Sequence, residues 1–587
     1  MGRVARAQRL WRTLRPLKRR QWTARLMLRV RRGRIDPSPA PPLKVAAEWV
    51  PAIPRPVPVH QDRDGFAFTF LGRTVTIQSP ADWTDPKHAK LWRYNAHYLD
   101  ALCPTPQGSD RSLWDAWSAE QHGLPEQDLR PALIARWIAD NPPSHGDGWE
   151  PYTTSLRIVN MVRYHARGGA LDAAMRQSLA VQARWLAQHV EWHLLGNHLF
   201  ANAKALVLSG LAFEGAEAAR WLNQGAAILA RELSEQALPD GGHFERSPLY
   251  HAIILEDVLD LINAFRALDR LDAPRALDDI TGLVARLETA AERMVSALKI
   301  MTQPDGGPFF FNDCAFGIAP PARTLLDYAE RLGVAAGSDA PHPAARASVT
   351  HLADTGYIRL EAGEATVLFD AAPVGPAYIP GHAHADTLSF ELSVGADRII
   401  VNGGTSTYER DTLRAHERST AAHATVTVDG QDSSEVWAAF RVGRRAEAFA
   451  IRTAVEEAGA KAAARASHNG YHHLSPSSTH TRALDLDATH LTITDEVTGP
   501  QQAVARFPFA PDVSCVRHTD RTFTVTTPTR TMKLTVSAPA QVERTLWAPR
   551  FGRRIERDCL VVAFRGALKT QIAHGAPAAA TTPGRLP

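Results

Sequence analysis

A helical periodicity runs through the first half of the chain. Between about residues 82 and 332, apolar residues recur three and four positions apart in stretches rich in Ala, Leu, Glu and Arg, such as residues 173–192 and 251–268. Loops that carry Pro and Gly separate these stretches. The pattern predicts an all-α domain over residues 82–345.

A different pattern begins at about residue 346. Short runs such as TLSFELSV, HLTITDEV and MKLTVSAP alternate polar and apolar residues, are rich in β-branched residues and are separated by turn residues. We therefore expect an antiparallel β-sandwich or barrel over residues 346–573, followed by a disordered tail over residues 574–587. A helical block followed by a strand block indicates an α+β chain with segregated domains rather than a βαβ fold.

The N-terminal region differs from both blocks. Residues 35–81 begin Pro-rich and predict a linker or a strap laid over a domain surface. Residues 1–34 hold 13 Lys or Arg and no Asp or Glu, with Leu10, Trp11 and Leu14 among the arginines. This basic arm suits an amphipathic helix on an anionic membrane surface or polymer, and it equally suits a solvated tether.

Charge separates the arm from the body. The residues beyond the arm include 53 of the 66 basic residues and all 62 acidic residues, a net charge of −9. This charge argues against a body built to bind nucleic acid over a broad basic face. The four cysteines include no CxxC pair and imply neither a zinc knuckle nor a disulfide framework. No window is apolar over the roughly 18 residues that a membrane span needs, and no apolar signal segment follows the N-terminal charges. A cytoplasmic or inner-membrane peripheral location therefore fits the visible sequence.

Polar residues without an evident structural role gather in four places. They lie in WEPYTTSLRIVN (149–160), GNH (196–198), PDGGHFERSPLYH (239–251) and PGHAHADTLSF (380–390). Each has a plain structural explanation when taken alone: Asn197 and His198 satisfy backbone groups at a helix end, and Tyr250 is a half-buried aromatic. The presence of all four in one chain favours a catalytic site over separate structural roles.

His382 and His384 are two residues apart in predicted extended chain. Side chains at i and i+2 point the same way there, so the two imidazoles face one site. That spacing suits a metal or a paired acid and base, and His423 and Asn402 lie at nearby predicted strands. Two or three His ligands favour zinc or a similar ion.

Six motifs follow one another in a defined order along the chain. They are GNHLFANAKAL, DGGHFERSPLYH, FFNDCAFGIAP, GHAHADTLSFEL, VNGGTSTYE and TAAHATVTVDGQ. Together they resemble the heparinase II/III family of polysaccharide lyases, and the resemblance covers roughly residues 85–570. It implies an N-terminal α/α toroid, an incomplete barrel, followed by a C-terminal antiparallel β-sandwich. It also implies cleavage of a uronic-acid-containing polysaccharide by β-elimination, in a site between the two domains.

β-Elimination explains why the implied residue types are needed. The site must neutralise the uronate carboxylate, remove the adjacent proton and protonate the departing oxygen. By resemblance, Asn197 neutralises the carboxylate, and His198 is a second candidate for neutraliser or base. Tyr250 matches the catalytic tyrosine, a general acid and a candidate base. His382 matches the histidine that the β domain brings into the cleft, and the choice of base among these residues stays open.

The resemblance further implies a structural divalent metal in the sandwich and no organic cofactor. His384 and His423 match its ligands, with zinc the first candidate, whereas Asn402 stands where an acidic ligand is usual. Asn402 departs from the family pattern, since a neutral amide binds zinc less well than a carboxylate. Five further residues are expected in the substrate groove: Tyr152, Arg157, His243, Glu245 and Arg246.

Two other functions stay open. A metal-dependent glycan hydrolase would hold its metal at His382, His384 and His423 and use Asp386 as the base. A non-catalytic glycan-binding or exopolysaccharide assembly protein would keep the fold and use the arm at a membrane. For the lyase, the expected partner is an acidic polysaccharide with few or no sulfates, because the body is not cationic. The resemblance places such an enzyme in the periplasm or cell envelope.

Overall fold

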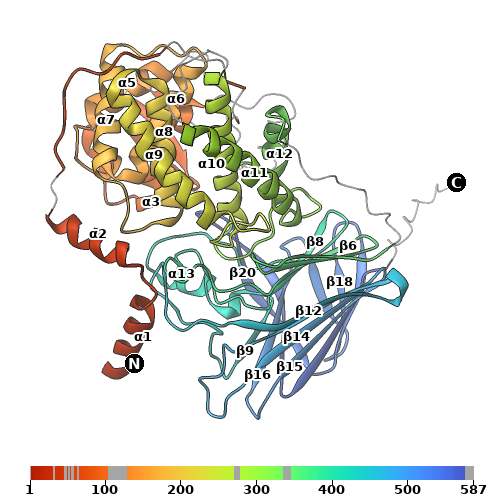
Figure 1. Ribbon diagram of the computed structural model, residues 1–587. Coiled ribbons are helices and arrows are strands. Elements are labelled where there is room, and N and C mark those ends of the chain that lie inside the picture. The colour runs from red at the N-terminus through yellow and green to blue at the C-terminus, as the bar shows by residue number, and fades with distance from the viewer. Residues whose placement is uncertain are drawn as a thin grey trace.

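The computed structural model describes residues 2–30, 33–44, 49–50, 53, 59–62, 65–103, 129–269, 278–334 and 346–575. Most of its helices gather in one body and most of its strands in another (Figure 1). This arrangement confirms the predicted order of a helical region followed by antiparallel sheets. Within the described residues, no helix has the length and apolar character needed to cross a membrane. Most of the predicted tail, residues 576–587, lies outside the described residues.

The helical domain is built around α8 (Gly196–Ala212). Each of the 17 residues of α8 except His198 is buried, as expected for a helix that is apolar on all sides. The next helix, α9 (Gly215–Gln236), packs closely against it, because a Cβ on Gly225 would stand only 2.7 Å from the carbonyl oxygen of Ala203. The other helices of this domain are α3 (Lys90–Tyr98), α5 (Arg130–Asp140), α6 (Pro151–Ala166), α7 (Ala173–Gln188), α10 (Pro248–Asp269), α11 (Asp278–Ile300) and α12 (Ala322–Arg331).

Three antiparallel sheets form the C-terminal domain around one shared core. The five-stranded sheet has the order β4 (Ser348–Leu352), β5 (Tyr357–Ala362), β6 (Ala365–Asp370), β7 (Phe390–Val394) and β8 (Asp397–Ile400). The eight-stranded sheet has the order β12 (Ala448–Glu456), β13 (Lys461–His468), β14 (His480–Asp487), β15 (His490–Val497), β22 (Ala567–Ala573), β19 (Thr531–Val536), β18 (Thr522–Thr526) and β17 (Ser514–Arg517). The four-stranded sheet has the order β20 (Ala540–Arg550), β21 (Arg553–Phe564), β16 (Ala503–Pro508) and β9 (Val426–Val428). Apolar side chains of all three sheets share one buried cluster.

Part of the predicted linker is a small sheet instead. Its three antiparallel strands are β1 (Val59–Asp62), β2 (Gly65–Phe70) and β3 (Arg73–Ile77). Phe66 and Phe68 of β2 are buried, and the ring of Phe68 contacts that of Trp83. These strands therefore pack on the helical domain and do not form an extended linker. The prolines that prompted the linker prediction end at Pro58, and the following FAFTF run buries apolar side chains against the helical domain.

The basic arm is helical and lies along both domains. It forms α1 (Arg3–Leu14) and α2 (Arg19–Val30). α2 contacts the helical domain and α1 contacts the short hairpin of β10 (Val436–Trp437) and β11 (Arg441–Val442), at the side of the molecule (Figure 1). Of the two alternatives for the arm, helices are therefore observed rather than a free tether.

The helical and β domains are joined by a polar contact beside the predicted site. Asp240 accepts a hydrogen bond from the backbone N–H of Thr355 over 2.7 Å. Arg246 donates from Nε to the carbonyl oxygen of Thr355 over 3.0 Å and from Nη2 to that of Asp354 over 3.2 Å. We call these four residues the interdomain clamp. It ties the loop before α10 to the turn between β4 and β5.

Candidate active site

Asn197 opens α8 at a sharp turn of the backbone. Leu195 and Gly196 have φ values of 69° and 60°, a left-handed conformation that glycine adopts without strain. Asn197 donates to Glu245 Oε1 twice, from Nδ2 over 2.9 Å and from its backbone N–H over 3.2 Å. Glu245 therefore fixes the Asn197 amide at the N-terminus of α8, where the helix dipole favours anions.

Tyr250 and His382 meet although they come from different domains. Tyr250 lies in the first turn of α10, and its ring stacks on the imidazole of His382 with the centroids 3.8 Å apart. The hydroxyl oxygens of Tyr250 and Tyr408 are 3.0 Å apart. Burial, reinforced by Tyr408, raises the pKa of Tyr250 well above its usual value. The Tyr250 hydroxyl therefore keeps its proton at neutral pH.

Asp313 holds the histidines of the site through one carboxylate. It accepts from His382 Nδ1 over 2.9 Å, from His384 Nε2 over 2.8 Å and from Arg414 Nη2 over 2.7 Å. Burial alone would raise the pKa of Asp313, but Arg414 and the two imidazoles outweigh it and hold that pKa well below its usual range. Because an ionised carboxylate only accepts, Nδ1 is the nitrogen of His382 that donates to Asp313, and Nε2 is the nitrogen that Asp313 leaves free. This nitrogen lies 3.5 Å from Glu245 Oε2, a buried oxygen without a hydrogen-bond partner.

His198 is paired with a second buried carboxylate. Its Nδ1 lies 3.2 Å from Glu191 Oε1, and its ring lies against that of Tyr152 with the centroids 4.4 Å apart. Burial opposes protonation of His198, but Glu191 outweighs it and raises the pKa of the imidazole. His198 is therefore protonated more readily than a free imidazole, and the cation so formed suits a substrate carboxylate.

Three predicted groove residues serve structure instead. Arg157 is 0% exposed, with its guanidinium 3.6 Å over the ring of Trp137, because a position on the inner face of α6 points it into the core. His243 is buried and its Nε2 contacts Gln236. Arg246 donates to the carbonyl oxygens of Thr355 and Asp354 in the interdomain clamp and to that of Phe244. The structure gives these three residues structural contacts, whereas Tyr152 and Glu245 contact His198 and Asn197.

Sequence reasoning missed four residues of the site. Asp313 and Tyr408 lie within two of the quoted motifs, FFNDCAFGIAP and VNGGTSTYE, so the signal was present but not assigned. Arg414, in α13 (Thr412–Glu417), and Glu191 lie outside every motif. Only the fold shows that their charges meet the histidines.

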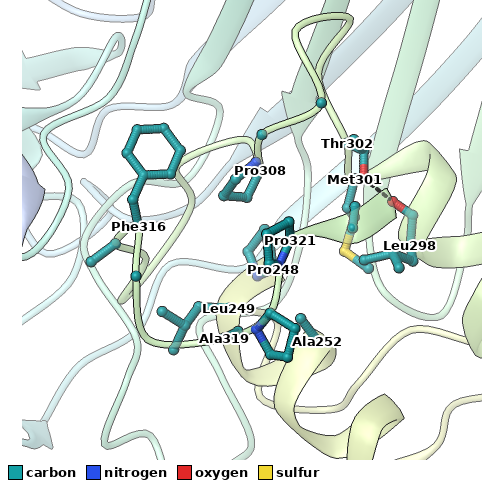
Figure 2. A pocket seen from close by; sticks show the side chains of 16 residues that line it. Pro248, Leu249, Ala252, Leu298, Met301, Thr302, Pro308, Phe316, Ala319 and Pro321 are labelled. Carbon is teal, nitrogen blue, oxygen red and sulfur yellow. Dashed lines mark hydrogen bonds between the residues drawn. The ribbon is translucent and has the colours of Figure 1, made fainter. Parts of the chain in front are cut away.

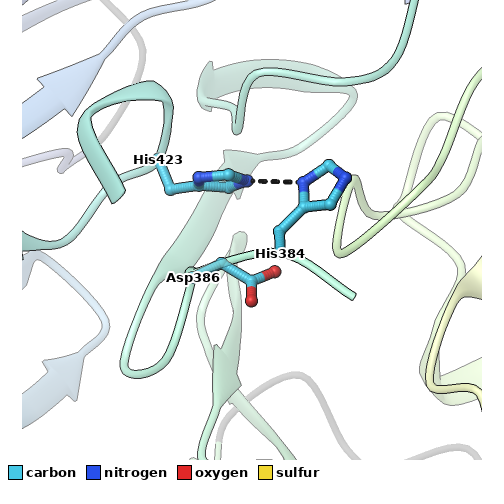
Figure 3. Close-up of side chains that lie close together, drawn as sticks. All are labelled: His384, Asp386 and His423. Atoms are coloured by element: carbon cyan, nitrogen blue, oxygen red, sulfur yellow. Dashed lines mark hydrogen bonds between the residues drawn. The ribbon is translucent and has the colours of Figure 1, made fainter. Parts of the chain in front are cut away.

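His384 and His423 bring two ring nitrogens together in the β domain. His384 Nδ1 and His423 Nε2 are 3.1 Å apart, and a carboxylate oxygen of Asp386 lies within 4.8 Å of both (Figure 3). His384 donates from Nε2 to Asp313, and His423 donates from Nδ1 to the carbonyl oxygen of Ser419. The two facing nitrogens are therefore both lone-pair donors. Burial lowers the pKa of both imidazoles, that of His384 to about 4, so the three residues fit a bound cation.

Asn402 does not join this cluster through a free oxygen. Its Oδ1 accepts from the backbone N–H of Ala424 over 2.9 Å, and its buried Nδ2, which cannot bind a metal, has no hydrogen-bond partner. Asn402 Oδ1 is thus engaged with the backbone, and the carboxylate that lies beside the two imidazoles is that of Asp386.

A separate depression lies on the far side of the first turn of α10. Pro248, Leu249, Met301 and Phe316 line it, and no titratable group is among its lining residues (Figure 2). An apolar wall without an acid, a base or a cation cannot perform acid–base chemistry. The groups whose chemistry suits acid–base work are instead those around Asp313.

Comparisons with known proteins agree with this arrangement. The family model described as heparinase II/III N-terminus matches residues 135–314, and the one described as heparinase II/III-like, C-terminal, matches residues 344–575. A heparin-sulfate lyase from Pedobacter heparinus is 27% identical over 376 residues, which are 59% of this chain and 49% of that protein. FtsZ-localized protein C from Caulobacter vibrioides is 27% identical over 311 residues, 51% of this chain and 47% of that protein. The chain thus spans about half the length of these curated relatives.

Solved structures share the fold. Heparinase III superposes with a TM-score of 0.60 at 16% identity, covering 88% of this chain and 80% of that one. A mutant of the heparan sulfate lyase HepC from Pedobacter heparinus superposes with a TM-score of 0.56 at 17% identity, covering 87% and 82%. The fold is an α/α toroid followed by an antiparallel β-sandwich. With both of its domains matched by family models, the chain belongs to the heparinase II/III-like family.

Proposed function

We propose that this protein is a polysaccharide lyase that cleaves a uronic-acid-containing glycan by β-elimination between its two domains. The observation that carries the proposal is the convergence of Asn197 and Tyr250 from the helical domain with His382 from the β domain. Binding alone does not require a neutraliser, an acid and a base in one place. The names of the lyase relatives support the same reaction class.

Substrate binding begins at the N-terminus of α8. The remaining N–H of the Asn197 amide and the positive end of the α8 dipole stabilise the uronate carboxylate, and His198, whose pKa is raised, adds a positive charge when it is protonated. Neutralising that carboxylate makes the adjacent C–H more acidic, because the carbanion formed there spreads its charge onto the carboxylate. The Glu245 and Glu191 carboxylates hold Asn197 and His198 in position.

Proton transfer then divides between His382 and Tyr250. Nε2 of His382, the nitrogen not bonded to Asp313, takes the proton from the carbon next to the carboxylate, and Glu245 Oε2, 3.5 Å from this nitrogen, stabilises the imidazolium that forms. Tyr250 keeps its proton because its pKa is raised, so it suits the general acid that protonates the departing glycosidic oxygen. The C–O bond breaks as the new C=C bond forms, and water takes no part.

The uronan is expected to carry few or no sulfates. The body outside the arm has a charge balance of −9, and two of the arginines expected in the groove, Arg157 and Arg246, are engaged inside the protein. A carboxylate can be met by Asn197 and His198, whereas a densely sulfated chain needs a field of cations. A carboxylated, weakly sulfated polysaccharide therefore fits best.

A structural metal belongs to the same proposal. His384, His423 and Asp386 would hold a divalent cation, zinc first, which when bound supplies a cross-link between two loops of the β domain. His384 also donates to Asp313, the carboxylate that orients His382. These residues thereby position the base without touching the substrate.

The test is to incubate the protein with a panel of uronic-acid polysaccharides and follow the ultraviolet absorbance of the unsaturated uronate that only elimination produces. Tyr250→Phe is expected to abolish this signal, by at least about a hundredfold, while glycan binding persists. Tyr471→Phe is the matched control, since the Tyr471 hydroxyl is buried away from the cleft and bonds the carbonyl oxygen of Val426. New reducing ends without absorbance would replace the lyase by a hydrolase. Full activity in Tyr250→Phe would refute the role of Tyr250.

A further inference from the structure

The two helices of the arm contact the body through their polar faces. On α1, Arg9 Nε donates to Glu435 over 2.7 Å, and Thr13 accepts from the indole N–H of Trp437 over 3.1 Å. On α2, Gln21 is 1% exposed, and its Nε2 contacts the carbonyl oxygens of Leu194 and Tyr378, each over 3.3 Å. A helix that lies on a protein surface normally does the reverse and buries its apolar face.

The apolar faces of both helices point away from the body. Val4, Leu10 and Trp11, on one face of α1, are 72%, 44% and 64% exposed. The stripe Trp22, Leu26 and Val30, four residues apart on α2, is 48%, 63% and 75% exposed. Of the 13 large apolar side chains that are exposed among the described residues, eight lie between residues 4 and 30. An apolar surface this concentrated marks an interaction site.

Basic side chains border this apolar surface. Arg3, Arg6, Arg19 and Arg29 are exposed on α1 and α2, and residues 1–34 contain no acidic residue. A partner of this arm must therefore offer negative charge at its surface and apolar depth behind it. That combination is the interface of an anionic lipid bilayer.

We propose that the arm docks the protein on an anionic lipid bilayer, with α1 and α2 lying in the headgroup region. Each helix has 12 residues, too short to span the hydrocarbon core, but its one-sided apolar face suits shallow insertion. An acidic polysaccharide would pair with the arginines and leave Trp11, Trp22 and Leu26 in water. A bilayer takes both the charged and the apolar groups, so it is the better occupant.

The attachment points of the arm connect this docking to the cleft. Gln21 contacts Leu194, three residues before Asn197, and Tyr378, four residues before His382. The Lys18 ammonium lies 3.9 Å over the ring of Tyr378 and pairs with Glu235 of the helical domain. Docking would therefore hold the cleft next to the bilayer. The proposal itself does not depend on the lyase activity.

Vesicle flotation with the full chain tests the proposal. Vesicles of phosphatidylglycerol and phosphatidylcholine are expected to carry the protein, and vesicles of phosphatidylcholine alone are not. Trp11→Asp and Leu26→Asp should each weaken binding at least about tenfold, because each removes a buried apolar side chain from the bilayer. Arg6→Gln and Arg29→Gln should each weaken it about fivefold, and added salt should weaken it further.

The matched controls are apolar residues of similar exposure elsewhere. Val516→Asp and Phe449→Asp change side chains that are 54% and 44% exposed in the β domain, so vesicle binding should be unchanged. Circular dichroism checks that each variant is folded. The proposal is overturned if the protein does not float with anionic vesicles, or if the arm variants bind like the wild type. It is also overturned if Trp11→Asp converts a dimer to a monomer without changing vesicle binding. Binding of the arm to an acidic polysaccharide but not to vesicles would overturn it as well.

Discussion

The Glu191 carboxylate controls the protonation of His198. Burial works against the charged imidazole, yet its pKa lies above the ordinary value of 6.5 because Glu191 is 3.2 Å away. A raised pKa in the folded state means that protonation stabilises the fold. This contribution is fully present below pH 6.5, the unfolded value, and is lost as the pH rises through the higher folded value.

Removing that carboxylate should therefore lower the pKa of His198. In Glu191→Gln, the largest influence that raises this pKa is gone, and only the smaller effects of Glu245 and Glu150 still oppose burial, so we expect the pKa to fall and the stability gained from protonation of His198 to shrink. NMR titration of the imidazole and urea unfolding at several pH values measure both effects. Glu496→Gln, which removes a half-exposed carboxylate paired with Arg465 on the β-sandwich, is the control. An unchanged His198 titration in Glu191→Gln would contradict the assignment.

At the same scale, motifs revealed the residues that we propose to act on the substrate and missed those that hold them in position. Asn197, Tyr250 and His382 stand out because each lies in a polar motif between apolar stretches, and these motifs follow one another in a defined order along the chain. Arg414 reaches Asp313 from 101 residues away in sequence, and no local pattern encodes such a contact. Arg157 shows the opposite error. Its place beside a predicted helix start suggested an exposed cation in the groove, but the fold buries it.

Among the elements, α8 carries a charged cluster inside the helical domain. Lys204 is 2% exposed and donates to Asp257 over 2.6 Å and to Asp260 over 2.5 Å. Arg163 of α6 pairs with the same Asp260 and with Glu256. The cluster ties α6, α8 and α10 together at the centre of the domain. Buried charges of this kind are stable only while they remain paired.

Lys204→Met keeps the length of the side chain and removes its charge. Asp257 then lacks its cation, so we expect the free energy of unfolding to fall by about 3–5 kcal/mol. Urea unfolding followed by circular dichroism measures this loss. Lys87→Met, at a lysine whose side chain is 84% exposed, should change the same quantity by less than about 1 kcal/mol. Equal effects of the two substitutions would show that the buried cluster adds no stability.

Element types were predictable because burial follows periodicity, but the position of each element was not. The helical and alternating halves match their patterns, and their order is as expected. The strands β1 to β3 were hidden by the prolines before them, which dominate the local composition. Lys204 shows a further limit: α8 is apolar on all sides, so the sequence identifies it as buried but does not show which helices its lysine joins.

For the whole molecule, the metal cluster predicts how the β domain responds to chelation. If His384, His423 and Asp386 hold zinc, removing it should lower the melting temperature by about 5–10 °C, since a tightly bound ion stabilises only the folded state. Metal analysis of the purified protein and thermal unfolding with and without chelator measure this. His423→Ala should reproduce the effect, and His518→Ala, on an exposed histidine, should not. Purified protein without metal, and with a melting temperature indifferent to added zinc, would contradict the site.

The interdomain clamp fixes the position of the two domains relative to each other beside the candidate site. The proposed acid, Tyr250, is carried by the helical domain and the proposed base, His382, by the β domain, and Asp240 and Arg246 hold the two domains together nearby. The distance between the proposed acid and base therefore depends on how the two domains are positioned relative to each other. A hinge opening that admitted a long polymer would separate acid from base, and reclosure would restore them. The polysaccharide would then react only while both domains contact it.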